Sequence, residues 1–203
     1  MSKIGYGIVV WFMWFSGLSM AVIAQLDRSH MPQSLCGWPS LHTNGRFPEW
    51  NTRIAQYLLG YALNESVVVV NGIFSNQTTQ DIESFQKLMN LNINGYLNSD
   101  TWPSLIETPG ISPLEADSSA NIDVRDTLPI MALQDALTAN GFKTEITGVY
   151  DELTVTNMAL FQIQVGSEIT TGTIVDEDMW HLLTTSCNTT SDSYYWFDAG
   201  WPQ

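Results

Sequence analysis

The side chains that most often carry chemistry are few and scattered in this sequence. Its histidines, His30, His42 and His181, share no metal-ligand spacing, and its cysteines are Cys36 and Cys187. Neither group supplies the clustered ligands of a familiar zinc site or a nucleophile beside a base. The acidic residues fall in turns, at helix starts and in one connector, where capping and solvation explain them. We therefore expect no catalytic site, no metal and no cofactor.

Polar and aromatic residues beside glycines are the other candidates, because they recur in the same order in two parts of the chain. The first series is Asn71-Gly72-Ile73-Phe74, Thr78, Phe85-Gln86, Asn94-Gly95, Asp100-Thr101-Trp102 and Leu105. The second series is Thr147-Gly148-Val149-Tyr150, Thr154, Phe161-Gln162, Thr171-Gly172, Asp178-Met179-Trp180 and Leu183. The displacement between them is about 76 residues and drifts by only one or two. This constant register predicts two copies of one unit.

Each copy opens with the pattern of an amphipathic helix. In the second copy Asp126 or Thr127 can cap the helix, Pro129 suits its first turn and Gly141 ends it. In the first copy an equivalent apolar spacing follows Pro48. These two segments are therefore expected to be equivalent helices.

Two further helices are expected in each copy. Amphipathic patterns run from Thr78 to Met89 and from Glu152 to Val165. The third helix of each copy is short, with Ser99 or Asp100 and Asp176 as nearby cap candidates. The predicted fold class is mainly α, with two tandem small three-helix modules joined by an acidic linker.

The order of these landmarks resembles the peptidoglycan-binding-like domain family. The resemblance is carried by a leading helix with Leu133-Gln134, a Gly turn, a Thr that opens the next helix, Phe-Gln within that helix, a second Gly turn, and a closing Trp and Leu. It covers residues from Glu49 to Ile106 and from Leu128 to Thr184. Members of this family are compact three-helix modules that accompany cell-wall hydrolases. The resemblance therefore implies attachment to wall polymers.

Eight residues of the repeat are candidates for ligand binding. They are Asn71, Gln86, Asn94, Trp102, Thr147, Gln162, Thr171 and Trp180. The two tryptophans more often belong to the core of so small a module than to a sugar platform. The two glutamines either hydrogen-bond a turn backbone, as a buried amide requires, or face a groove and contact a ligand. The turn glycines favour a structural role, since glycine adopts backbone angles that other residues avoid.

The start of the chain has the pattern of a targeting segment. Lys3 precedes an apolar run from Ile4 to Ala24, which predicts a signal peptide cleaved after Ala24. The alternative is an uncleaved anchor, since about 20 apolar residues can span a bilayer. Export places Cys36 and Cys187 in an oxidising compartment, where one disulfide is favoured over two free thiols. We expect a secreted or extracytoplasmic protein.

The expected organisation has six parts. They are a signal peptide (1–24), an N-terminal extension with Cys36 (25–48), a first module (49–107), a linker (108–126), a second module (127–185) and an aromatic tail (186–203). The tail carries Tyr194, Tyr195, Trp196, Phe197 and Trp201. These rings either pack on a module or form an exposed stacking surface for sugars or a partner. Sequons at Asn64, Asn76 and Asn188 would be glycosylated only in a eukaryotic secretory route.

Charge and composition restrict the partners. The chain has 7 basic and 21 acidic residues, a formal net charge of −14. Nucleic acids and anionic membranes would be repelled by such a surface. We expect a non-catalytic protein that binds cell-wall glycan, either peptidoglycan or a similar polymer, through two tandem modules. The alternative is a structural or protein-interaction protein that retains the fold without glycan binding and contacts another secreted protein.

Overall fold

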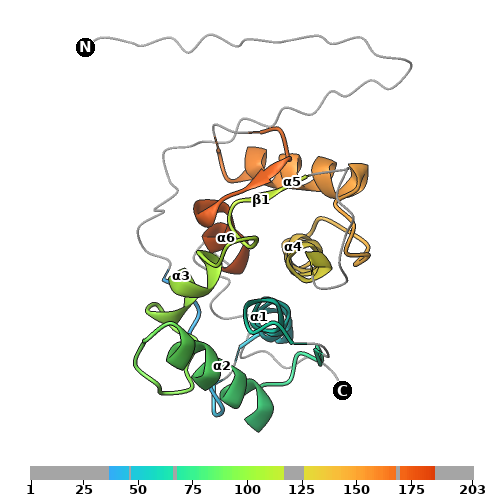
Figure 1. The fold of residues 1–203 in the computed structure, drawn as a ribbon. Helices are drawn as coiled ribbons and strands as arrows, with labels where there is room; N and C mark the ends of the chain where they lie inside the picture. The colour runs from blue at the N-terminus through green and yellow to red at the C-terminus, as the bar shows by residue number, and fades with distance from the viewer. Residues whose placement is uncertain (1–36, 46, 66–67, 117–125, 168–169, 186–203) are drawn as a thin grey trace, which may run out of the picture.

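The structure, a computed structural model, describes residues 37–45, 47–65, 68–116, 126–167 and 170–185. Within these ranges the elements are α1 (Glu49–Ala62), α2 (Asn76–Leu88), α3 (Thr101–Ile106), β1 (Leu114–Glu115), α4 (Thr127–Ala139), α5 (Glu152–Gln164), β2 (Ile174–Val175) and α6 (Glu177–Thr184). Figure 1 shows α1 and α4 side by side, with α2 packed on the far side of α1 and α5 on the far side of α4. The mainly helical fold class is confirmed. We call α1 to α3 the first helix set and α4 to α6 the second.

Several sequence predictions concern residues outside the described ranges. These are the signal peptide (1–24), the disulfide between Cys36 and Cys187, the sequon at Asn188 and the aromatic tail (186–203). They stay predictions. Among the described residues, no helix combines the length and the apolar character that crossing a membrane requires.

Side-chain caps explain where three of the helices begin. Ser75 caps α2, with the backbone N–H of Thr78 donating to its hydroxyl at 3.3 Å. Asp151 caps α5 by accepting the Thr154 N–H at 2.8 Å. Asp176 caps α6 by accepting from the backbone N–H three residues on, as predicted. Each cap satisfies a donor that the first helical turn leaves free.

Two other helix starts differ from the sequence expectation. Asp126 stands at the N-cap position of α4, but its side chain makes no capping hydrogen bond, because its backbone is already helical there. At α3 the cap comes from Asn98, whose side-chain oxygen accepts the Thr101 N–H at 3.2 Å. Asp100, one of the predicted candidates, makes no side-chain cap bond. The helices themselves lie where the apolar spacing predicts them.

The turn glycines have the structural role that the sequence favours. Gly72, Gly95, Gly148 and Gly172 all have φ between +69° and +73°. This left-handed conformation is costly for residues that carry a Cβ atom. Gly172 has a second reason, because an added Cβ would collide with the backbone carbonyl oxygen of Val155. These four turns therefore need glycine to bring one helix back against the next.

Two short extended segments, each preceding one helix set in the sequence, pack against the helices. Leu114 in β1 lies opposite Val175 in the antiparallel partner β2, and Ile111 is fully buried. Part of the predicted linker (108–126) is therefore packed structure. Likewise Leu41, in the predicted N-terminal extension, is fully buried and exchanges two backbone hydrogen bonds with Leu97, at 2.9 and 3.1 Å. Pairing over two residues is too short to show a periodicity in the sequence.

One continuous hydrophobic core runs through both helix sets, and specific contacts join them along α1 and α4. The Arg53 guanidinium on α1 donates to both carboxylate oxygens of Asp135 on α4, at 2.6 and 2.8 Å. This hydrogen bond is the main cause that raises the pKa of Arg53. The Trp38 ring lies 5.7 Å from Trp102 and 4.5 Å from His181, measured between ring centroids. The two helix sets thus form a single packed body.

Candidate functional site

Four buried or nearly buried glutamines hold the four glycine turns, and we call each arrangement a glutamine clamp. The glutamines are Gln56, Gln86, Gln134 and Gln162. Each comes from a helix and points its amide into the turn that follows that helix. The clamps are the feature that the two helix sets share most closely.

The Gln86 clamp shows the geometry. Its Oε1 atom accepts the backbone N–H groups of Asn94 and Gly95 at 2.9 and 3.0 Å. Its Nε2 atom donates to the carbonyl oxygen of Tyr96 at 2.9 Å and to the Thr101 hydroxyl at 3.1 Å. The Gln86 side chain is fully buried. Its amide is therefore committed to the turn, as a buried polar group must be.

Four of the eight predicted ligand-binding residues are buried in this internal framework. Gln86 and Gln162 are buried and bonded to turn backbone, which is the structural one of the two roles that the sequence allows. Trp102 and Trp180 are fully buried, and their indole N–H groups donate to the carbonyls of Pro39 and Ile111, both at 2.8 Å. The tryptophans thus fasten the extended segment in front of each helix set.

The other predicted residues lie at the turns and are exposed. The side chains of Asn71, Asn94 and Thr147 each accept the backbone N–H two residues further on. Thr171 shares a hydrogen bond with Thr173. Three of these side chains also accept a hydrogen bond from the glutamine of their clamp. The pairs are Gln56 with Asn71, Gln86 with Asn94, and Gln134 with Thr147. Of the eight candidates, only these turn residues reach the surface.

Sequence reasoning did not single out Gln56 and Gln134 as clamps. Gln56 binds the turn at Gly72 as Gln86 binds the turn at Gly95. A signal was present, because three of the turn glycines are followed six residues later by the threonine that the glutamine contacts. These threonines are Thr78, Thr101 and Thr154.

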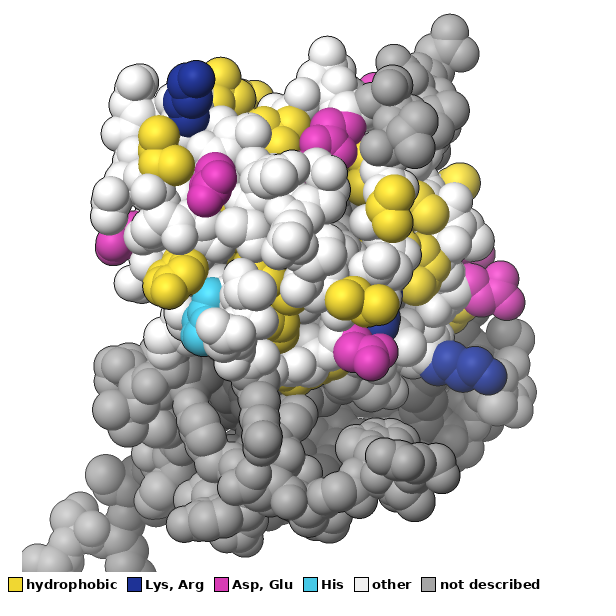
Figure 2. Space-filling view, turned by 90° about the horizontal axis from the view of Figure 1, so that it is seen from below, with side chains coloured by type: hydrophobic (Ala, Val, Ile, Leu, Met, Phe, Trp, Pro, Cys, Tyr) yellow, Lys and Arg dark blue, Asp and Glu magenta, His cyan; other side chains and the backbone are white. Residues whose placement is uncertain are grey.

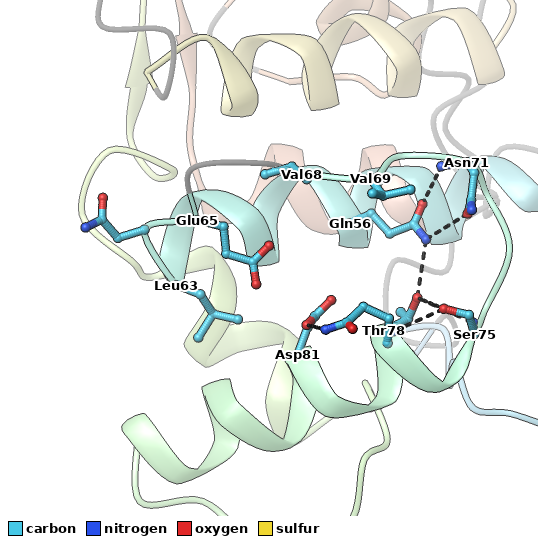
Figure 3. Close-up of a pocket in the computed structure, with 11 residues that line it drawn as sticks. Gln56, Leu63, Glu65, Val68, Val69, Asn71, Ser75, Thr78 and Asp81 are labelled. Carbon is cyan, nitrogen blue, oxygen red and sulfur yellow. Dashed lines mark hydrogen bonds between the residues drawn. The ribbon is translucent and has the colours of Figure 1, made fainter.

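A cleft of about 630 Å³ lies beside the first clamp, between the C-terminal end of α1 and the N-terminal half of α2 (Figure 3). Its described lining residues are Gln56, Leu63, Asn64, Glu65, Val68, Val69, Asn71, Ser75, Gln77, Thr78 and Asp81. Figure 3 shows the carboxylates of Glu65 and Asp81 directed into the same space. Polar residues therefore outnumber the apolar ones, Leu63, Val68 and Val69, in the lining of the cleft.

The electrostatics of this cleft are acidic. Partial burial raises the pKa of Glu65, and the neighbouring charge of Asp81 raises it further. Asp81 accepts a hydrogen bond from the Gln77 amide at 2.8 Å. The described lining residues include no lysine or arginine. The cleft suits neutral polar groups and amines better than anions.

In the second helix set, the residue that corresponds to Asp81 makes a direct internal contact. Asn157 stands three residues after Thr154, as Asp81 stands three residues after Thr78. Its side-chain amide donates to the Thr144 hydroxyl at 2.8 Å and to the Lys143 carbonyl at 3.1 Å. Asn157 is only 8% exposed. The amide therefore fills the position that a carboxylate occupies in the first set.

Metal ligands do not gather among the described residues. Within the ranges that the structure describes, there is no group of three or more histidine, cysteine, aspartate or glutamate side chains placed to hold a metal ion. His42 contacts the rings of Phe47 and Tyr96, whereas His181 contacts Trp38. The two described histidines thus belong to separate aromatic groups.

Comparison with known proteins gives one match. Residues 52–105 match the model of the family described as "Putative peptidoglycan binding domain". This segment runs from α1 into α3 and contains both clamps of the first set and all the lining residues of the cleft. Comparisons with curated proteins and with solved structures give no match. Residues 52–105 are therefore similar to a peptidoglycan-binding domain.

Proposed function

We propose that this chain is a non-catalytic, secreted protein that binds peptidoglycan through its first helix set. The observation that carries the proposal is the family match over residues 52–105, which encloses the cleft between α1 and α2. A binding domain needs a concave, preformed site with a few polar groups that fix orientation. The glutamine clamp beside the cleft supplies the rigidity for such a site.

The cleft offers groups that complement peptidoglycan. The polymer presents sugar hydroxyls, amides and free amino groups of its peptide stems. The amide of Gln77 and the hydroxyl of Ser75 can exchange hydrogen bonds with hydroxyls and amides. Glu65 and Asp81 attract a protonated amine. The same pair disfavours teichoic-type phosphates and other anions.

The second helix set is, in this proposal, a second copy of the same domain. Its support is the repeated clamp at Gly148 and the repeated tryptophan bond, from Trp180 to the Ile111 carbonyl, which parallels the bond from Trp102 to Pro39. Because the Asn157 amide is bound to Thr144 and Lys143, this copy has no carboxylate at the position of Asp81 and contributes mainly architecture.

The test is a pull-down of the full chain with purified peptidoglycan at moderate salt. Retention of the wild-type chain is expected, and the double variant Glu65→Gln, Asp81→Asn should bind about three- to tenfold more weakly. The matched control is the double variant Glu152→Gln, Asp178→Asn, which removes two negative charges from exposed positions in the second set. If purified peptidoglycan does not retain the wild-type chain, the proposal is wrong.

The alternative of an interaction protein without glycan binding has one observation in its favour. The outer face of α5 carries Leu153, Leu160 and Ile163, each about half exposed. The same pull-down separates the two functions, because the alternative requires that neither peptidoglycan nor chitin retains the chain.

A further inference from the structure

Four aromatic side chains form a continuous row on the first helix set, which we call the aromatic row. In order they are Tyr96, His42, Phe47 and Phe74, with ring centroids 5.2, 6.5 and 5.6 Å apart. Tyr96 is 48% exposed, and the other three are half-buried. The rings come from three separate segments, so their alignment is produced by the fold and cannot follow from sequence spacing.

The first half of the row is held by the extended segment in front of α1. The paired backbones of Leu41 and Leu97 place His42 beside Tyr96. A tight turn then brings the chain back, with the Gly45 N–H donating to the His42 carbonyl at 2.9 Å. Gly45 has no room for a side chain, because a Cβ atom would lie 2.5 Å from the Phe47 ring. The two rings flank a turn that is shaped to bring them together.

The second half of the row is held by the glutamine clamps. Gln86 binds the backbone carbonyl of Tyr96, and Gln56 binds the carbonyl of Ile73, the residue before Phe74. In both cases the clamp binds the backbone and not the ring: the Tyr96 ring stays 48% exposed, whereas the Phe74 ring packs partly against the core. The aromatic row is therefore preorganised, which lowers the entropic cost of binding a ligand.

We propose that the aromatic row binds the pyranose rings of a glycan strand. Aromatic rings pack against the C–H faces of sugar rings. The neighbouring rings of the row are inclined to one another by 38°, 70° and 68°, so they can contact a sugar strand with both faces and edges. The hydroxyls of Thr43 and Thr79, 3.4 Å apart beside His42, are placed to exchange hydrogen bonds with sugar hydroxyls. This inference rests on the proposed function and assigns the glycan strand, as distinct from the peptide stem, to a particular surface.

The charge and the size of the surface favour a glycan over the other ligands that aromatic rings bind. Single-stranded nucleic acids also stack on aromatic rings, but they need a basic groove, whereas this chain has three acidic residues for each basic one. A stable protein interface takes roughly 20–30 residues a side, far more than four rings supply. Figure 2 shows a face on which hydrophobic side chains lie scattered among uncharged groups and a few acidic and basic side chains, without a single large apolar patch. A neutral sugar strand fits this surface.

The second helix set uses its matching positions differently. Tyr150 corresponds to Phe74, but its hydroxyl donates to the Gly172 carbonyl at 2.8 Å, and burial raises its pKa. Thr173 follows the turn glycine where Tyr96 stands in the first set. Among the described residues, the first set therefore has this aromatic row and the second set does not.

The test uses soluble β-1,4-linked N-acetylglucosamine oligomers with the full chain, followed by calorimetry and by NMR. Saturable binding is expected, weakened about tenfold in Tyr96→Ala, which removes one stacking partner. Tyr96→Phe should retain binding, because the ring remains. The matched control is Leu160→Ala, which truncates an equally exposed side chain, at 47%, in the second set. Phe47→Leu, a second truncation within the aromatic row, should also weaken binding.

The outcomes separate this inference from the proposed function. If intact peptidoglycan retains the chain but the oligomers do not bind, the role of the aromatic row is overturned and peptidoglycan binding at the cleft still stands. An equal loss of oligomer affinity in Tyr96→Ala and Leu160→Ala would also overturn the role of the aromatic row. Failure with both the oligomers and intact peptidoglycan would overturn both proposals.

Discussion

The two helix sets share one internal framework and present different surfaces. Both hold their glycine turns with glutamine clamps, and both fasten a preceding segment with a buried tryptophan. On α2 the outward positions are Gln77, Ser84 and Lys87, whereas the equivalent positions of α5 are Leu153, Leu160 and Ile163. The contrast teaches that internal hydrogen bonds specify the fold, and that the surface positions are free to differ in function.

The largest effect is expected from removing one clamp from each helix set. Gln86→Leu and Gln134→Leu should each lower the free energy of unfolding by about 2–4 kcal/mol, because buried backbone N–H groups lose their acceptor. Urea unfolding followed by circular dichroism measures the loss. A large loss in only one set would show that the two frameworks are not equivalent.

The helix caps offer a sharper test, because one is neutral and the other is charged. Ser75→Ala and Asp151→Ala should each cost about 1 kcal/mol at neutral pH. The backbone and side-chain hydrogen bonds from Thr154 lower the pKa of Asp151. Its contribution is therefore present above the ordinary carboxylate pKa and is lost as the pH falls through the lowered folded-state value.

Unfolding measured between pH 7 and pH 2 checks this difference. The effect of Asp151→Ala should shrink below about pH 4, whereas that of Ser75→Ala should stay constant. If the loss of stability has the same pH dependence in both variants, the charge of the Asp151 carboxylate does not contribute to its cap.

The smallest effect concerns the cleft. Asp81→Asn gives the first set the residue that the second set has at Asn157. The pKa of Glu65 should then fall toward its ordinary value and remain above it, because burial is the larger cause and stays in place. A carboxyl NMR titration of Glu65 measures the change. An unchanged pKa would show that the two carboxylates do not interact across the cleft.

The sequence predicts the helices and the roles of the glycines well, because both depend on local pattern. Apolar spacing marks α1 to α6, and a positive φ follows from glycine in a repeated turn. The segments around Leu41 and Ile111 could not be predicted, since their burial depends on pairing with distant residues. The burial of Trp102 and Trp180 follows from the sequence as well, because large aromatic side chains dominate the core of so small a unit.

The site was harder to predict than the fold. The cleft depends on the length of the connection after α1, and the aromatic row depends on three segments meeting in space. Hydrogen-bonding capacity could have located the clamps, since a glutamine, a turn glycine and a threonine recur together. Which turn side chains remain exposed, such as Tyr96, is decided by packing that no local pattern reports.

The ion pair between Arg53 and Asp135 has a consequence for valency. It fastens α1 to α4, so the distance between any contact made by the first helix set and any made by the second is set by helix packing. Two binding units on a flexible tether can engage any pair of sites within reach. The second set is locked against the first, and its Asn157 is bound internally, so it adds no independent binding unit. We therefore expect one-to-one binding without avidity.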